Sequence, residues 1–108
     1  MALIKWQTKA KGHVKLIIDY YREHASVAVA QSFKSTLISS VDKLYDFPLL
    51  GKRDTQFSTE DTQYYFLVVG WRKRSYKVYY LYENDICSIL AVWDCSRNPD
   101  KLKEWVFE

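Results

Sequence analysis

The chain has 108 residues with a formal net charge of +3, and this length suits one domain, 1–108, with a single core. Hydrophobic residues make up 48% of the sequence and glycine and proline are scarce, which excludes a linker or a disordered tail. The mild basic excess permits contact with nucleic acid but does not by itself indicate it.

The sequence has no pattern typical of a membrane span, a signal peptide or a cofactor site. No apolar run approaches the ~20 residues of a membrane span and residues 1–12 lack a signal-peptide pattern, so we expect a cytoplasmic protein. Cys87 and Cys95 fall within and just after one expected strand, too far apart for a disulfide. With His13 and His24 they show no zinc-site spacing, so we expect free thiols, no metal and no cofactor.

Residues 2–26 predict a strand followed by an amphipathic helix. Residues 2–6 are mostly apolar, as in a short strand, and Thr8 is placed to cap the helix that follows. An apolar stripe at helical spacing then continues for about four turns. It consists of Ala10, Val14, Ile17 and Tyr21.

A second helix follows after residues 24–26 interrupt the helical period. Ser26 is placed to cap it, and Pro48 and Gly51 end it. Its apolar stripe consists of Ala30, Phe33, Leu37, Val41 and Leu44. Two helices joined by so short a link must fold back as a helical hairpin, with both stripes facing one sheet.

The C-terminal half predicts three strands and a short helix. Residues 54–62 are a polar loop that we expect in solvent, 63–69 a strand, and 71–74 the turn into an aromatic-rich strand. Asn84-Asp85 tolerates positive φ, so the chain can reverse there before an apolar strand at 86–93. A terminal helix is predicted to start at Asn98-Pro99. Its apolar residues Leu102, Trp105 and Val106 share one face.

The expected fold is therefore α+β with the order β-α-α-β-β-β-α. A helical hairpin packs on a mostly antiparallel four-stranded sheet, and a short C-terminal helix follows. In the strand 86–93 strict alternation places two apolar sets on opposite faces: Ile86, Ser88, Leu90 and Val92, against Cys87, Ile89, Ala91 and Trp93. The face away from the hairpin is either an apolar surface kept for a protein partner, or is covered by loops and long aromatic side chains.

Seven basic residues fall at loops and strand ends that such a fold can bring to one rim. They are Lys52, Arg53, Arg72, Lys73, Arg74, Lys77 and Arg97. Beside Trp71, Tyr76 and Trp93 they would suit a surface that binds backbone phosphates and stacks bases, and we expect nucleic-acid contacts from Trp71, Arg72, Lys73, Arg74 and Arg97. An ordinary solvated turn is the alternative.

Three segments carry a family resemblance. They are the run YKVYY at 76–80, ILAVWD at 89–94 and RNP at 97–99. Together they resemble the end of RelE/ParE-superfamily toxins, in which a "YRVxY" strand pairs with an "ILxIWDxRxNP" strand, a form associated with plasmid-stabilisation proteins of the ParE type. The family motif "P…G(K/R)" occurs here as PLLGK at 48–52. This motif and the order of elements extend the resemblance along nearly the whole chain.

The resemblance implies the toxin of a bacterial type II toxin-antitoxin module, held inactive in a heteromeric complex with a cognate antitoxin. ParE-like members are described as poisoning DNA gyrase, whereas RelE-like members cleave mRNA on the ribosome by stabilising charge at the scissile phosphate with Lys and Arg. A non-toxic nucleic-acid-binding or adaptor domain with the same fold is a third alternative. Whether the chain is an enzyme stays open.

The resemblance also ranks the residues expected to carry toxicity. Arg97 and Lys77 lie within the matched segments and come first, followed by Lys52, Arg53, Arg72 and Arg74. His13 and His24 are predicted on the first helix, facing solvent or at its end, so catalysis by histidine is not expected. Toxin branches that use a histidine near the C-terminus therefore fit less well than ParE-like members.

Overall fold

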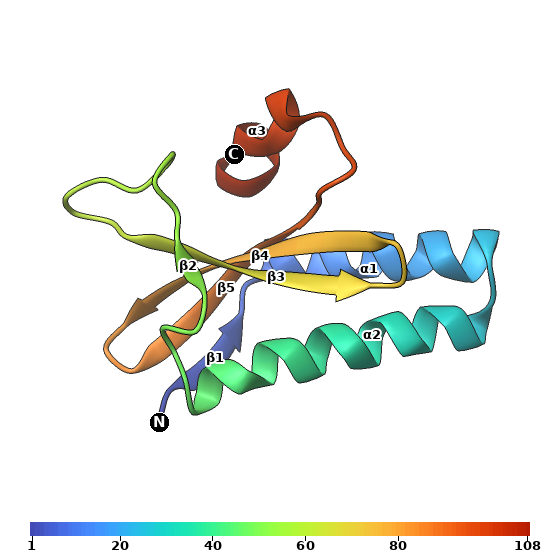
Figure 1. Cartoon of the computed structure of the whole chain (residues 1–108), viewed down its shortest axis with the longest axis horizontal. Coiled ribbons are helices and arrows are strands. Elements are labelled where there is room, and N and C mark those ends of the chain that lie inside the picture. Colours follow the sequence, from blue (N-terminus) through green and yellow to red (C-terminus); the bar gives the residue numbers. More distant parts are fainter.

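The elements follow one another in the predicted order, as a computed structural model of residues 1–108 shows (Figure 1). They are β1 (Leu3–Trp6), α1 (Thr8–His24), α2 (Val27–Asp42), the 3-10 turn η1 (Lys43–Tyr45), β2 (Lys52–Arg53), β3 (Tyr64–Trp71), β4 (Arg74–Glu83), β5 (Ile86–Asp94), the 3-10 turn η2 (Pro99–Lys101) and α3 (Leu102–Phe107). The predicted α+β class is confirmed. None of the helices combines the length and apolar character that crossing a bilayer requires.

The sheet has five strands in the order β1-β5-β4-β3-β2, one more than predicted. β1 pairs with β5 in parallel and every other pairing is antiparallel. The additional strand, β2, has only two residues, with Lys52 opposite Phe66 and Arg53 opposite Tyr65. Two residues are too few to show an alternating pattern, so its pairing depends on the neighbouring strand and not on its own sequence.

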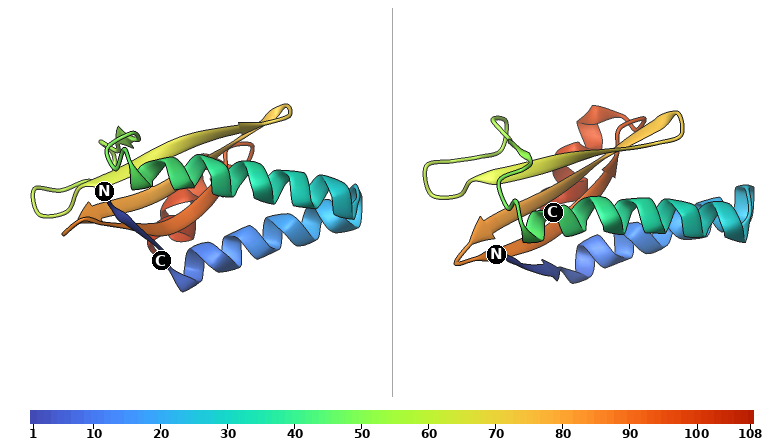
Figure 2. Two further views of the ribbon diagram at one scale, coloured as in Figure 1. Left: turned by 90° about the horizontal axis from the view of Figure 1, so that it is seen from below. Right: turned by 60° about the horizontal axis from the view of Figure 1, so that its bottom comes forward.

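The helical hairpin covers one face of the sheet, as Figure 2 shows. Both predicted stripes lie in this core, where Ile17 is half-buried and the other stripe residues are buried. Ser26 caps α2 as predicted, because its Oγ accepts a hydrogen bond from the Val29 N–H at 3.0 Å. The prediction for Thr8 is wrong: Gln7 holds the cap position of α1 without a side-chain bond, and Thr8 is the first helical residue.

The other face of the sheet is covered by α3 and by the loop at 54–62 (Figure 1). Its core contains Tyr79, Ala91, Trp93, Leu102 and Val106. α3, the loop and aromatic side chains together cover most of this face, while Val68 of β3 stays exposed, so the structure is closer to the second of the two alternatives. The loop is not wholly in solvent, because Phe57 packs on this core and buried Asp54 accepts the Phe57 N–H at 2.6 Å.

A β-bulge changes which residues of β5 face which core. Tyr79 lies opposite Ala91 and Tyr80 opposite Ile89, so Leu90 has no partner in the ladder. As a result Ile89 and Val92 both join the core under the helices, while Ala91 joins the core under α3. Leu90 still faces the core under α3, so the predicted strict alternation is wrong from Ala91 onward, where the unpaired residue has shifted the period by one.

The predicted turn of the hairpin is confirmed, and a hydrogen-bonded contact that the sequence did not predict fixes residues 48–52. Asn84 and Asp85 adopt φ of 53° and 61° at the turn between β4 and β5. Near β2, the Gly51 N–H donates to the Tyr80 hydroxyl at 3.0 Å, and that hydroxyl donates to the Pro48 carbonyl at 2.9 Å. Burial raises the pKa of Tyr80 to about 12, so the hydroxyl keeps its proton at neutral pH. The segment PLLGK is thus held on the end of the sheet by one buried tyrosine.

Candidate functional site

The seven predicted basic residues do not meet at one rim. Lys52 and Arg53 pair near the start of β3, whereas Arg72, Lys73 and Arg74 lie at its far end. At about 3.3 Å per residue, the five steps along β3 from Phe66 to Trp71 separate these groups by roughly 17 Å. Lys52 and Arg53 are exposed, and Arg53 donates to the Gln63 side chain.

Lys77 and Arg97, the two favoured residues, also lie apart. Lys77 points to the face of the sheet that α3 covers, and its Nζ lies 4.5 Å from the centre of the Phe66 ring. Tyr76, the preceding residue, points to the opposite face and joins the core under the helices. Adjacent strand residues face opposite sides, so Lys77 cannot share a surface with Arg74, which lies three residues away.

The aromatic residues expected to stack on bases are buried. Trp71 and Tyr76 lie in the core under the helices, and Trp93 lies in the core under α3. The guanidinium of Arg72, at a turn position with φ of 56°, lies 4.9 Å from the Trp71 ring centre. At this turn the Trp71 ring is buried, whereas Arg72 and Lys73 are exposed to solvent. Near Arg74 and Arg97 the accessible aromatic side chains are those of Tyr20, which is exposed, and Trp105, which is half-buried.

Arg74 and Arg97 are the two predicted residues that the fold brings together. Both line a pocket of about 340 Å³ along the edge of β5, which we call the Arg74–Arg97 pocket. Its remaining walls come from α1 (Leu16, Ile17 and Tyr20), from the sheet (Tyr76, Val92 and Asp94) and from α3 (Trp105). The pocket is therefore mainly apolar, with two guanidinium groups and one carboxylate.

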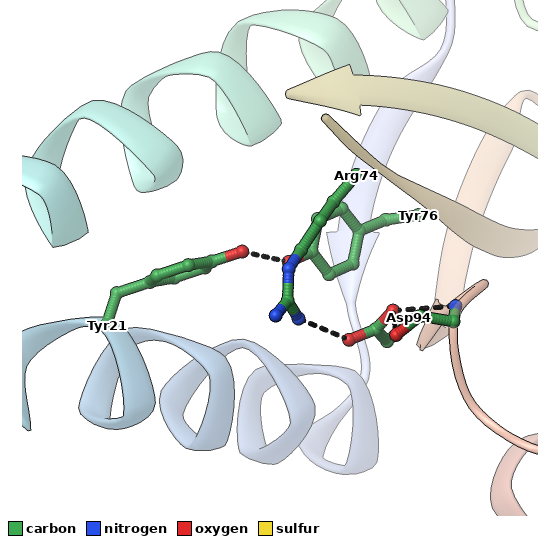
Figure 3. Close-up of polar contacts among 5 residues, drawn as sticks. Tyr21, Arg74, Tyr76 and Asp94 are labelled. Carbon is green, nitrogen blue, oxygen red and sulfur yellow. Dashed lines mark hydrogen bonds and ion pairs between the residues drawn. The ribbon is translucent and has the colours of Figure 1, made fainter. Parts of the chain in front are cut away.

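Arg74 is held over the pocket by a partly exposed ion pair (Figure 3). Its Nη1 lies 3.4 Å from Asp94 Oδ2, with 41% of the Arg74 side chain and 19% of the Asp94 side chain exposed. The other carboxylate oxygen accepts from the Ser96 N–H at 2.9 Å and from the Ser96 hydroxyl at 2.7 Å. Asp94 is thus fixed by Ser96, and its other oxygen balances the charge of Arg74 through one long contact.

Below Arg74 the hydroxyls of Tyr21 and Tyr76 share a buried hydrogen bond, which Figure 3 also shows. Burial, together with this bond, raises the pKa of Tyr76 well above its ordinary value. The Tyr76 phenol therefore stays neutral at physiological pH, and the bonded pair joins α1 to β4 directly beneath the pocket.

Arg97 has no carboxylate partner, since the only ion pairs of the chain are Lys15–Asp19 and Arg74–Asp94. Its guanidinium lies 4.4 Å from the Trp105 ring centre, and its backbone N–H donates to the Asp94 carbonyl at 3.0 Å. Arg97 also borders a second hollow of about 790 Å³, which contains Lys9, Lys101, Glu104 and Glu108. Lys9 and Lys101 are thus basic neighbours of Arg97 that no sequence pattern singled out.

His13 supports this arrangement, and the prediction that it faces solvent is wrong. It is only 7% exposed, and its Nδ1 accepts the Val92 N–H at 3.1 Å. The Val92 carbonyl accepts the Trp105 Nε1–H at 2.7 Å. Burial, with Lys9 and Arg97 nearby, lowers the pKa of His13 to about 4, so the imidazole is neutral. The sequence did contain a signal for this burial, because His13 lies on the apolar stripe of α1, three residues after Ala10 and four before Ile17.

Known proteins share the sequence pattern and the architecture of this chain. The family model described as "ParE toxin of type II toxin-antitoxin system, parDE" matches residues 4–99. The chain belongs to the ParE toxin family. A solved structure, "Chromosomal ParDE TA system from P. aeruginosa", is similar over 87% of this chain and 96% of that one, with a TM-score of 0.68 and 15% identity. At that identity the likeness shows the fold. No curated protein matches the chain.

The ParE match covers only part of the pocket. Arg74, Asp94 and Arg97 lie within the matched residues, whereas α3, which supplies Trp105, follows them. In this ParE-family chain the site offers charge-assisted hydrogen bonds from two guanidinium groups beside an apolar wall. That chemistry suits recognition of an anionic group carried by an apolar surface.

Proposed function

We propose that this ParE-family chain is the toxin of a type II toxin-antitoxin module that acts in the cytoplasm on DNA gyrase and is neutralised by a cognate antitoxin. The match of the ParE family model to residues 4–99 carries the proposal. The similar solved structure is that of a ParDE toxin-antitoxin system, which supports an antitoxin as the partner of this chain as well.

The geometry of the site supports a protein target over phosphate cleavage. Of the seven predicted basic residues, Arg74 and Arg97 line the Arg74–Arg97 pocket, and Arg74 is already paired with Asp94. Exposed Leu16 and Tyr20 at the pocket favour an apolar partner. The Nδ1 of His13, whose ring packs on Trp105 of the pocket wall, is occupied by a backbone N–H.

Induction of the chain in a bacterial host tests the proposal. We expect growth arrest with filamentous cells and DNA damage, and rescue when the product of the adjacent small open reading frame is co-expressed. Purified chain should inhibit supercoiling by gyrase in vitro. Ribosome-dependent mRNA cleavage without gyrase inhibition would select the nuclease instead, and normal growth with soluble, folded chain would leave a non-toxic adaptor domain.

A further inference from the structure

The mouth of the Arg74–Arg97 pocket carries exposed apolar side chains. Leu16 is 59% exposed and Tyr20 is 45% exposed, and both lie on α1 one helical turn apart. Residues four apart stand side by side on a helix, so the two side chains form one continuous apolar edge. An exposed apolar edge beside a hollow is typical of a surface that a partner covers.

The charged groups of the pocket are arranged to receive one further anion. Arg97 has no carboxylate partner and its guanidinium lies on the Trp105 ring, 4.4 Å from the centre. A guanidinium that packs on an aromatic ring keeps the N–H groups at its edge available for hydrogen bonds. Because the ring already restricts the arginine side chain, pairing with a carboxylate costs less conformational entropy. Asp94 already balances Arg74, which leaves the charge of Arg97 unopposed within the pocket.

The edge of β5 beside the pocket is closed to an added strand. The Val92 N–H donates to His13, and the Val92 carbonyl accepts from Trp105. A peptide therefore cannot extend the sheet at this position by backbone pairing, because both groups already have partners. Recognition has to come from side chains that enter the pocket.

We propose that the Arg74–Arg97 pocket binds a segment of the antitoxin that presents a large apolar side chain next to an Asp or Glu. The apolar side chain enters between Leu16, Tyr20 and Trp105, and the carboxylate pairs with Arg97. The volume of about 340 Å³ lies at the small end of the roughly 300–1,000 Å³ of ligand pockets, which suits one anchoring side chain. The identity of the partner rests on the proposed function.

Nucleic acid fits the pocket less well. Binding a phosphate backbone takes several unpaired cations in a row, whereas this pocket has one unpaired guanidinium, one paired with Asp94, and apolar walls. Binding of the segment would also cover Arg97, one of the two residues that the family resemblance ranks first for toxicity.

Small-molecule probes test the chemistry on the isolated chain. The probes are 4-phenylbutyrate, its neutral amide and the matching amine, each titrated while the methyl signals of Leu16 and Val92 and the indole signal of Trp105 are followed by NMR. We expect the acid to bind roughly tenfold more tightly than the amide, because a charge-assisted bond replaces a neutral one. The amine should leave these signals in place.

Matched variants locate the interaction. Arg97→Gln should remove the preference for the acid over the amide, while Arg22→Gln, an exposed arginine of α1 outside the pocket, should keep it. Equal binding of acid and amine would overturn the proposal. Tighter binding of a 5′-phosphorylated thymidine dinucleotide at the same signals would overturn it in favour of nucleic acid.

A complex with the product of the adjacent open reading frame tests the partner. In that complex the probe-induced shifts should disappear, and Leu16→Asp should weaken the complex at least tenfold while Lys34→Asp, on the exposed face of α2, should not. Unchanged probe binding in the complex would contradict an antitoxin at this site. Growth arrest by a chain that fails these binding tests would refute the pocket assignment alone, and binding without growth arrest would refute the toxin function alone.

Discussion

The imidazole of His13 lies almost parallel to the indole of Trp105, with the ring centroids 4.3 Å apart and the planes inclined by 19°. Both rings also bond to Val92, one at its N–H and one at its carbonyl. Three segments, α1, β5 and α3, thus meet at one backbone position. Because Arg97 rests on the same indole, the packing of the C-terminal helix also sets where this guanidinium lies.

Replacing His13 tests the bond to Val92. His13→Ala leaves a buried N–H without an acceptor, which should lower the free energy of unfolding by about 1–3 kcal/mol. His13→Asn places an oxygen near the position of Nδ1 and should be less harmful. Urea denaturation of both variants measures the effect, with His24→Ala, at the exposed end of α1, as a control that changes stability by less than ~0.5 kcal/mol.

The same residue should make stability depend on pH. The pKa of His13 is lowered from 6.5 to about 4 in the folded chain, so between these values the unfolded chain binds more protons. The contribution of His13 is fully present above pH 6.5 and is lost as the pH falls toward 4, by an amount on the order of 2–3 kcal/mol. The stability difference between the wild type and His13→Asn should shrink over this range; a constant difference would mean that His13 does not titrate there.

Trp105→Phe separates the hydrogen bond from the packing. Phenylalanine keeps an aromatic ring against His13 and Arg97 but removes the Nε1–H that bonds to the Val92 carbonyl. We expect a loss of about 0.5–1.5 kcal/mol in unfolding free energy. Trp105→Ala should lose more, toward the lower end of the ~3–5 kcal/mol seen for aromatic truncations, because the ring is only half-buried. Equal losses for the two variants would show that packing contributes little.

Replacing two glycines by alanine should change the stability of the chain in opposite directions. A Cβ at Gly51 would lie 2.7 Å from the Phe66 carbonyl oxygen and from the Tyr80 hydroxyl, whereas nothing lies within 4 Å of one at Gly12. Gly51→Ala should therefore destabilise the chain by about 1–3 kcal/mol through overpacking. Gly12→Ala, within α1, should stabilise it by about 0.5–1 kcal/mol. Thermal unfolding of both measures the contrast, and a stable Gly51→Ala would show that β2 shifts easily.

Arg97 remains the first residue to replace in a growth assay. Arg97→Ala should sharply reduce growth inhibition while it lowers stability by no more than ~1 kcal/mol, the contribution of an exposed cation–π contact. Arg74→Ala should act in the same direction, since both line one pocket. Lys77→Ala should keep the inhibition, because Lys77 lies on the other face of the sheet. Loss of inhibition only in Lys77→Ala would move the active surface to that face.

The amino-acid sequence was sufficient for the helices and the main hairpin. The stripes of α1 and α2 and the cap at Ser26 depend on spacings of a few residues, and so does the turn at Asn84-Asp85. Such signals are local, because each depends on neighbours along the chain. The family resemblance rests on the same local segments, and the match to residues 4–99 confirms it.

Only the tertiary structure decided which side chains meet. The bulge at Leu90 exchanged the faces of β5, and the pairing of β2 with β3 separated Lys52 from the Arg74–Arg97 pocket. His13 accepts a hydrogen bond from the N–H of Val92, which lies 79 residues away in the sequence. Contacts between distant segments follow from strand register and helix docking. The period of a strand or helix shows which of its residues share a face, but not which residue of another segment each of them meets. For that physical reason the basic residues could be identified from the chain alone, whereas their division between two faces could not.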